Sequence, residues 1–483
     1  MNNEVTPVDY DRSRITVGIV HFGVGNFHRS HQAMYLDRLL CRGDAFEWGI
    51  CGVGVLPGDA AMRDALRGQD FEYTLVERHP DGAAPATRIG SIVDFLYAPD
   101  ELEAVLERLA DPATRIVSLT ITEGGYNISD VTGEFDASNP AIVADTQPGA
   151  APSTVFGIVV AGLRRRRERG VPPFTVMSCD NIEGNGHVAR GSFTAFARMV
   201  DAELADWIER EVSFPNCMVD RITPVTTDAD RFWVREQYGI DDAWPVLCED
   251  FVQWVLEDDF PLGRPMWEEV GVQLVADVRP YELMKLRLLN ASHQALAYSG
   301  LLSGYEFAHE GASDPVIAEY LRAYMDREAT PTLDPLPGVD LDAYKDQLIA
   351  RFANPYVRDT LGRLATDASD RIPKWLVPVI FERREAGERS PLSASIVAGW
   401  ARYAERCVAG DPLPFRDRQE DAVRAAVARM ADDPLGFLRN PDWFGDLADD
   451  PGFADDFGEV LAALRASDDP RPALLELARS ADR

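Results

Sequence analysis

The sequence predicts an α/β protein, with an N-terminal Rossmann-type dinucleotide-binding domain over residues 1–277 and a mainly α-helical C-terminal domain over residues 278–483. Three observations support this prediction. A buried strand runs into a glycine turn and a helix near the N-terminus, strand and helix patterns alternate as far as residue 276, and helical patterns dominate afterwards. Alternating strands and helices are typical of a parallel sheet covered by helices. A chain of 483 residues is long enough for two such domains.

The first strand is expected over residues 15–22, and the first helix over residues 33–40. The turn between them contains two glycines, which let a backbone approach a pyrophosphate beside the N-terminus of a helix. The third glycine of the dinucleotide fingerprint is missing, because position 28 is a histidine. An ordinary strand-to-helix turn is the alternative. The residues expected to bind a dinucleotide are Gly23, Val24, Gly25, Asn26 and Phe27.

A second strand is expected over residues 48–55, and Asp59 lies just beyond it. An acidic residue at the end of the second strand binds the ribose hydroxyls of the adenosine and disfavours a 2′-phosphate. Asp59 comes later than the usual spacing, so an exposed loop aspartate is the alternative. This position favours NAD over NADP as the cofactor.

Polar side chains follow two of the later strands. Glu123 comes after a strand expected over residues 116–122, and Asp180-Asn181 follow one over residues 174–179. Asp220 lies in a segment of similar appearance. Ligands of open α/β sheets bind outside the carboxyl ends of the strands, so Glu123, Asn181 and Asp220 are candidate site residues. Structural capping is the alternative. The other patterns here predict strands over residues 73–77 and 272–276 and helices over residues 102–109 and 154–167.

A helix without a breaker is expected from Glu282 to Ser299, after Pro280. At about 100° per residue, four polar residues fall within an arc of roughly 140° on an otherwise apolar helix; they are Glu282, Lys285, Asn290 and His293. A desolvated lysine has a lowered pKa and accepts a proton near neutral pH. An asparagine amide donates to a developing oxyanion. The stripe is therefore a candidate catalytic site, and a surface pair of Lys285 with Glu282 is the alternative.

The C-terminal half contains a basic pair, Arg371 and Lys374, on either side of Pro373. A contact with a phosphate or a carboxylate is one interpretation, and a solvated loop is the other. The helices expected around it cover residues 315–327, 341–352, 356–367, 391–408, 419–432 and 455–466.

Composition excludes several classes of function. The chain has 48 basic and 80 acidic residues, which argues against a nucleic-acid partner. Its six cysteines form no CxxC pair, which fits reduced thiols better than disulfides or structural zinc. No apolar run approaches the ~20 residues of a membrane span, and the N-terminus shows no signal-peptide pattern. We expect a cytoplasmic protein without a membrane or nucleic-acid partner.

Together these motifs resemble the polyol-specific long-chain dehydrogenases, the mannitol 2-dehydrogenase family, over nearly the whole chain. The resemblance is carried by the segments at residues 19–32, 120–126, 177–181 and 214–224 and by the spacing Lys285-x4-Asn290-x2-His293. It implies metal-independent, NAD-linked oxidation of a secondary alcohol on an open-chain polyol, D-mannitol to D-fructose, by a monomer.

The resemblance also implies a role for each candidate residue. Lys285 matches the catalytic base, Asn181 and Asn290 match the asparagines that polarise the reacting oxygen, and His293 matches the histidine that orients the substrate. The remaining matches are Asp220 in the substrate pocket, Glu123 and Glu282 on the route of proton exit, and Arg371 or Lys374 as the basic residue that binds substrate. The choice between the last two stays open.

Three other functions are compatible with parts of the sequence. The nearest is a sister activity, oxidation of D-arabinitol or D-sorbitol or reduction of a sugar acid such as fructuronate. A metal-dependent alcohol dehydrogenase with His28 and His31 as ligands is disfavoured, because no third ligand accompanies them. A catalytically inactive nucleotide-binding regulator is disfavoured by Lys285, because a sensor needs no proton acceptor.

Overall fold

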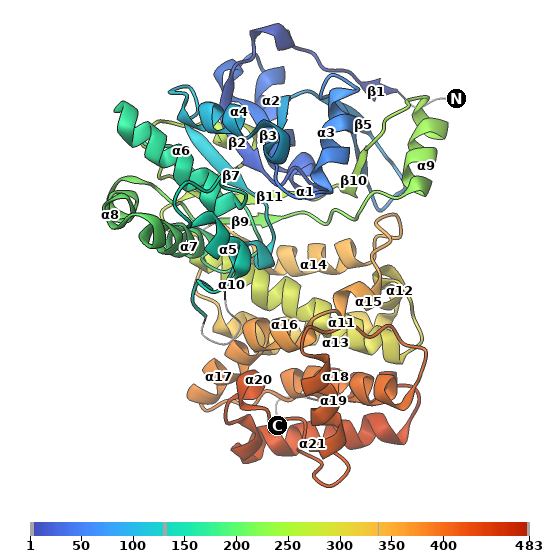
Figure 1. Ribbon diagram of the computed structural model, residues 1–483. Coiled ribbons are helices and arrows are strands. Elements are labelled where there is room, and N and C mark those ends of the chain that lie inside the picture. The colour runs from blue at the N-terminus through green and yellow to red at the C-terminus, as the bar shows by residue number, and fades with distance from the viewer. Residues whose placement is uncertain (1–3, 129–132, 337, 481–483) are drawn as a thin grey trace. The chain divides into compact units, whose positions relative to one another are not determined.

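The computed structural model describes residues 4–128, 133–336 and 338–480. The chain forms two compact units, Met1–Arg279 and Pro280–Arg483. The first contains the sheets, and the second is mainly helical (Figure 1). The predicted α/β class, with a Rossmann-type first unit and a helical second unit, is confirmed.

The first unit is built around a five-stranded parallel sheet. Numbered along the chain, its strands have the spatial order 3-2-1-4-5, which is the order of one dinucleotide-binding fold. The order reverses between β2 and β7, which makes the carboxyl end of this pair the topological switch point. In spatial order the strands are β6 (Ile92–Tyr97), β3 (Gly49–Gly54), β2 (Val17–Phe22), β7 (Ile116–Leu119) and β8 (Thr175–Ser178).

Helices cover both faces of this sheet. Val20 and Phe22 of β2 belong to one core with residues of α4 (Ala98–Ala110) and α6 (Val155–Arg169). Ile19 belongs to another core with residues of α2 (Gln32–Cys41). Because successive side chains of a strand point to opposite faces, burial of both sets makes β2 almost uniformly apolar. The other helices of this unit are α1 (Asn26–Ser30), α3 (Asp59–Arg67), α5 (Pro140–Asp145), α7 (Asn185–Val200), α8 (Ala202–Glu211) and α9 (Asp228–Tyr238).

Helix α6 illustrates how the sequence sets the ends of an element. The Thr154 hydroxyl accepts from the Gly157 amide at the N-terminus, and Gly170 ends the helix at φ +67°. The last turns are rich in arginine, which favours the negative end of the helix dipole. One of these arginines, Arg166, is buried and donates to the carbonyl oxygens of Leu109, Asp111 and Thr114.

Two of the predicted strands belong to other sheets. β4 (Tyr73–Arg78) pairs antiparallel with β5 (Ala86–Ile89) across a tight turn at Gly82, and β12 (Gln273–Val275) pairs with β11 (Gln253–Glu257). The expectation that both strands lie in the main parallel sheet is wrong. A short hairpin holds β4 next to β5, and β12 pairs with β11 instead. The edge strands of the main sheet are β6 and β8. Within the described residues the additional sheets have the orders β1-β5-β4-β10 and β12-β11-β9, with β1 (Val5–Thr6), β9 (Cys217–Asp220) and β10 (Val246–Glu249).

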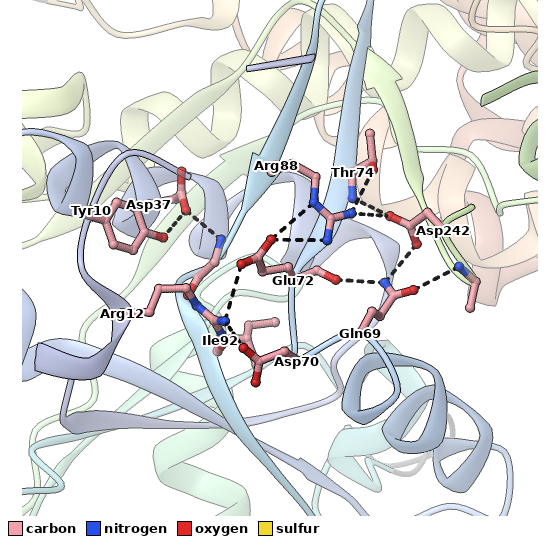
Figure 2. Close-up of polar contacts among 12 residues, drawn as sticks. Tyr10, Arg12, Asp37, Gln69, Asp70, Glu72, Thr74, Arg88, Ile92 and Asp242 are labelled. Atoms are coloured by element: carbon pink, nitrogen blue, oxygen red, sulfur yellow. Dashed lines mark hydrogen bonds and ion pairs between the residues drawn. The ribbon is translucent and has the colours of Figure 1, made fainter. Parts of the chain in front are cut away.

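A network of polar side chains joins the β4–β5 hairpin to the segment before β10 (Figure 2). The buried carboxylate of Asp242 accepts from the Thr74 amide at 2.6 Å and from Gln69 Nε2 at 3.0 Å. Arg88 lies within 3.3 Å of both Asp242 and Glu72. Charge-assisted bonds to a buried carboxylate are stronger than neutral ones, so this cluster ties segments more than 150 residues apart in the chain.

The second unit is a bundle of helices, and one of its predicted helices is wrong. Residues 356–367 form only α15 (Leu361–Leu364), because Arg358 and Asp367 adopt positive φ angles and Thr360 caps a new start. In contrast, α14 (Leu341–Phe352) has the predicted bounds.

The other elements of the helical unit are α10 (Arg279–Met284), the π-helix η5 (Lys285–Asn290), α11 (Ala291–Leu302), α12 (Ala308–Ser313), α13 (Pro315–Tyr324), the π-helix η6 (Met325–Ala329), α16 (Ala368–Trp375), α17 (Val377–Glu385), α18 (Pro391–Ala409), α19 (Glu420–Arg429), α20 (Pro441–Phe444), α21 (Pro451–Ala466) and α22 (Arg471–Arg479). In the described part of the chain, no helix has the length and apolar character needed to cross a bilayer.

Candidate active site

The glycine turn after β2 is shaped by contact with the end of β7. Gly23 has φ +91°, and a Cβ atom there would lie 2.1 Å from the carbonyl oxygen of Thr120. The Thr120 hydroxyl donates to the Gly23 carbonyl at 2.7 Å. At Gly25, by contrast, the atom nearest to an added Cβ would be the Gly23 oxygen at 3.9 Å. The turn therefore leaves bare backbone facing open space at the switch point of the sheet.

The other residues of the turn hold it in place. Asn26 Nδ2 donates to Pro224 O and Thr226 Oγ1, both at 2.9 Å, and its Oδ1 accepts from Arg29. Val24 is buried against β3, and Phe27 stacks on the ring of His31 at 5.0 Å. The Asn26 side chain is thus committed to the protein, and what this turn offers a ligand is its backbone.

Asp59 is the first residue of α3, directly after the turn that follows β3. Its Oδ2 atom accepts from the amides of Val55 and Leu56, each at 2.9 Å. Asp59 is therefore not the exposed loop aspartate named as the alternative, because it is half-buried in a helix and caps the turn before it. The same geometry fixes the carboxylate at the carboxyl end of the strand next to β2, which is where a ribose would be bound.

The ends of β7 and β8 are joined by Asp180. Its carboxylate accepts from the amides of Ile121 and Thr122 at 3.0 and 2.7 Å and from the Tyr126 hydroxyl at 2.8 Å. Burial raises the pKa of Asp180 to about 6, and the nearby charge of Glu123 adds to this rise. Asp180 thereby fixes the two loops that carry Glu123 and Asn181, which are both exposed at the strand ends. The third predicted residue, Asp220, lies outside these loops and is buried at the end of β9.

In the second unit, the polar stripe lies on a helix that contains a π-turn. Glu282, Lys285 and Asn290 are buried, and residues 285–290 are π-helical. The Ala291 amide donates to the Leu286 carbonyl, five residues back. The expected regular α-helix is therefore wrong in this segment. Residues five apart lie about 140° from each other around an α-helix. In a π-turn, i→i+5 bonding brings such residues closer together, on one side of the helix. π-turns are rare and frequent at functional sites.

Asn290 has an unused donor. Its Nδ2 atom is buried and has no hydrogen-bond partner among the described residues. Leaving a buried amide unpaired costs about 1–3 kcal/mol, so such groups call for an explanation. A ligand oxygen bound beside this amide would supply the missing acceptor.

His293 is half-buried one turn beyond Asn290, with its ring centroid 4.5 Å from that of Phe352. Desolvation holds the pKa of His293 well below its usual value, and nearby positive charges lower it further. The imidazole is therefore neutral at physiological pH. The cations that act on it are, in decreasing order, Arg363, Arg351, Arg371 and Lys285.

Arg363 and Arg351 were missed in the sequence. They lie 70 and 58 residues beyond His293, in α15 and at the end of α14, and no motif or spacing connects them with the stripe. Only the packing of α11 against α15 brings Arg363 near the stripe. Arg363 is paired with Asp359, which accepts from its guanidinium through both carboxylate oxygens.

The structure distinguishes the two basic residues of α16. Arg371 donates to the Leu364 carbonyl at 3.0 Å, and its charge lowers the pKa of His293. Lys374 has a side chain that is 62% exposed, and it pairs with Asp370 at 2.7 Å. Arg371 therefore belongs to the surroundings of His293, whereas Lys374 faces solvent.

The two histidines considered as metal ligands have other contacts. The ring of His28 stacks on that of His21 with centroids 3.4 Å apart, and His31 Nε2 bonds to the Gln253 carbonyl at 2.9 Å. Across residues 4–128, 133–336 and 338–480, no group of three His, Cys, Asp or Glu side chains is arranged to hold a metal ion.

Comparison with known proteins adds to this geometry. Residues 17–269 match the family model described as the mannitol dehydrogenase Rossmann domain, and residues 277–465 match the mannitol dehydrogenase C-terminal domain. The chain belongs to the mannitol dehydrogenase family. The resemblance inferred from the sequence motifs is confirmed, as is the expectation that the protein is an oxidoreductase of this type.

Members of the mannitol dehydrogenase family align over almost the full chain. The mannitol 2-dehydrogenase of Cereibacter sphaeroides is 43% identical over 465 residues, which cover 96% of this chain and 97% of that protein. The Pseudomonas fluorescens mannitol 2-dehydrogenase, solved as a ternary complex with NAD and D-mannitol, is 45% identical with a TM-score of 0.88, over 99% of this chain and 97% of that one. A substrate-free D-sorbitol dehydrogenase is 38% identical with a TM-score of 0.88, over 97% of both chains.

Proposed function

We propose that the protein catalyses the reversible, NAD-dependent and metal-independent oxidation of D-mannitol to D-fructose, with Lys285 as the general acid and base. The observation that carries the proposal is the π-turn of the second unit. It combines a buried lysine with a buried, unpaired amide on one turn of helix. The identity with mannitol 2-dehydrogenases over nearly the whole chain supports the choice of substrate.

The first unit fits the cofactor that this reaction needs. A side chain at Gly25 would occupy the space beside the backbone of the turn, and the absence of one is what close approach to a pyrophosphate requires. The backbone of residues 23–27 would hold the pyrophosphate and Asp59 the ribose hydroxyls. NAD, when bound, supplies the hydride acceptor for alcohol oxidation.

The proton chemistry follows from burial. Desolvation disfavours the charged form of a lysine, so neutral Lys285 takes the hydroxyl proton of the polyol. Asn290 Nδ2 donates to the oxygen on which negative charge develops. In the reverse direction, protonated Lys285 returns the proton to the carbonyl oxygen. The role of Asn181 on the same oxygen remains a prediction from the family resemblance.

Roles for the residues around Lys285 and Asn290 are proposed from their positions. Glu282 is buried one turn before Lys285 and is the acid placed to relay its proton. Neutral His293 both donates and accepts hydrogen bonds, as orientation of a polyol requires. Arg371 is proposed as the basic residue that binds substrate, in preference to Lys374. Glu123 and Asp220 keep their predicted roles in proton exit and in the substrate pocket.

Oxidation of D-sorbitol is the second candidate. It is favoured by the D-sorbitol dehydrogenase structure, whose TM-score of 0.88 equals that of the mannitol enzyme at lower identity. Initial rates with D-mannitol and D-sorbitol, each with NAD and NADP and in the presence of a chelator, separate these activities. A higher kcat/KM for D-sorbitol would replace the proposed substrate, and loss of activity in chelator would end the metal-independent assignment.

The lysine has a direct test. We expect Lys285→Ala to lose at least about 10³-fold in kcat, because the proton transfer depends on this group. NADH binding, followed by fluorescence, should stay unchanged. Lys374→Ala is the matched control, because that lysine is exposed on α16. Turnover of Lys285→Ala within a few-fold of the unmodified enzyme would refute the assignment.

A further inference from the structure

The π-turn at Lys285 raises a question of hydrogen bonding. The helix changes from i→i+5 bonds, such as Ala291 N–H to Leu286 O, back to the i→i+4 pattern of α11. Such a change leaves one carbonyl without a helical N–H donor. A buried carbonyl without a partner is costly, so a donor from elsewhere is expected at this junction.

Tyr324 supplies a donor there. It is the last residue of α13 and fully buried, and its hydroxyl donates to the Arg287 carbonyl at 3.2 Å. Arg287 follows Leu286, whose carbonyl takes part in the five-residue bond. Burial raises the pKa of Tyr324 well above its usual value, so the hydroxyl keeps its proton throughout the working range of the enzyme.

Arg287 is held at its other end as well. Its guanidinium donates to both carboxylate oxygens of Glu382, at 2.7 and 2.6 Å, and to the Thr332 carbonyl at 2.5 Å. Arg287 is itself buried. The middle of the π-turn is therefore anchored from outside the helix, two residues from Lys285 and three from Asn290.

We propose that Tyr324 is a positioning residue for Lys285 and Asn290, because its hydroxyl stabilises the π-turn against a regular α-helix. This inference rests on the proposed function of Lys285. A regular helix would satisfy the Arg287 carbonyl internally and would set Lys285 and Asn290 about 140° apart. Because the Tyr324 hydroxyl already donates to the Arg287 carbonyl in the π-turn, a regular helix gains no hydrogen bond at that carbonyl. The side chain itself touches none of the reacting atoms in this account.

The chain offers a matched control one turn earlier on the same helix. Tyr320 is also buried, and its hydroxyl pairs with Ser395 Oγ of α18 at 2.7 Å. Tyr320→Phe and Tyr324→Phe remove the same atom from the same kind of environment on α13. Only the second removes a donor from the π-turn.

The test compares the two variants in steady-state oxidation of D-mannitol by NAD across pH, with NADH binding and thermal unfolding measured in parallel. For Tyr324→Phe we expect kcat to fall at least about tenfold, as small misplacements of catalytic groups do. We also expect the apparent pKa of the kcat profile to move, while NADH affinity stays unchanged. Tyr320→Phe should keep kcat within about twofold and the same pH profile, even with a similar loss of melting temperature.

Equal losses of kcat in both variants, or an unchanged kcat and pH profile in Tyr324→Phe, would overturn the positioning role. The variant Lys285→Ala, measured in the same assay, separates this outcome from failure of the proposed function. If Lys285→Ala is inactive and Tyr324→Phe is normal, the positioning role alone is wrong. If Lys285→Ala turns over normally, the role of Lys285 is wrong and the positioning role with it.

Discussion

The two glycines of the turn after β2 allow the same substitution to be made twice with opposite expected results. In Gly23→Ala the new Cβ would lie 2.1 Å from the Thr120 oxygen, where carbon and oxygen normally stay about 3.5 Å apart. The oxygen belongs to backbone, so it cannot swing away. The positive φ costs an alanine about 1–2 kcal/mol, and the forced displacement about 1–3 kcal/mol. We therefore expect a loss of about 2–5 kcal/mol in the free energy of unfolding.

Gly25→Ala should behave differently. The backbone there has φ −96° and ψ −171°, which any residue adopts, and the nearest atom to the new Cβ is 3.9 Å away. Stability should change by less than about 0.5 kcal/mol. The methyl group would, however, occupy the space that a pyrophosphate enters. We expect NADH to bind at least about tenfold more weakly, because the backbone can no longer approach the phosphates.

Thermal unfolding and NADH fluorescence titration measure the two effects separately. At about 2–4 °C per kcal/mol, Gly23→Ala should lower the melting temperature by about 4–20 °C, and Gly25→Ala should leave it unchanged. A wild-type melting temperature for Gly23→Ala would refute the contact with Thr120. Wild-type NADH affinity for Gly25→Ala would refute the assignment of this turn to the pyrophosphate.

Three further outcomes are expected. Asp59→Ala should raise KM for NAD by at least about tenfold and leave KM for NADP nearly unchanged, because only the free ribose hydroxyls need the carboxylate; equal losses would remove Asp59 from the ribose site. Arg371→Ala should raise KM for D-mannitol, whereas Lys374→Ala should not, and the reverse result would exchange their roles. Asp180 keeps its proton up to a pKa of about 6 in the folded protein, against an ordinary value of 3.8, so its contribution to stability is full below pH 3.8 and is lost as pH rises through 6. In urea unfolding, Asp180→Asn should therefore cost about 1–2 kcal/mol more at pH 5 than at pH 8, and a pH-independent cost would refute the raised pKa.

Elements with a local signal could be predicted from the sequence. The run of residues 341–352 has a helical pattern closed by its own caps, and α14 has these bounds. The strand, glycine turn and helix near the N-terminus could be predicted for the same reason, because their signals lie within one short run of sequence. Strand β4 was predicted as a strand but placed in the wrong sheet, because sheet membership depends on pairing with β5 and β10, which local pattern does not encode.

The candidate site divides in the same way. Lys285, Asn290 and His293 could be predicted as candidates because one stretch of helical pattern carries all three at recognisable spacings. The π-turn among them could not be predicted, since one additional residue in a turn changes no residue type. Arg363 and Arg351 were missed because packing between helices, not spacing along one helix, brings their charges to His293.

The pairing of β4 with β10 has a consequence for synthesis of the chain. The main sheet is complete once β8 has emerged at Ser178, but β10 ends at Glu249, 71 residues later (249 − 178). At about 5–20 residues per second, ribosomes need about 4–14 s to make that interval. Throughout it, one edge of β4 has no neighbouring strand and Arg88 has no Asp242 to pair with. An open strand edge is a template for pairing with another chain, so the nascent protein is exposed to aggregation at this edge during these seconds.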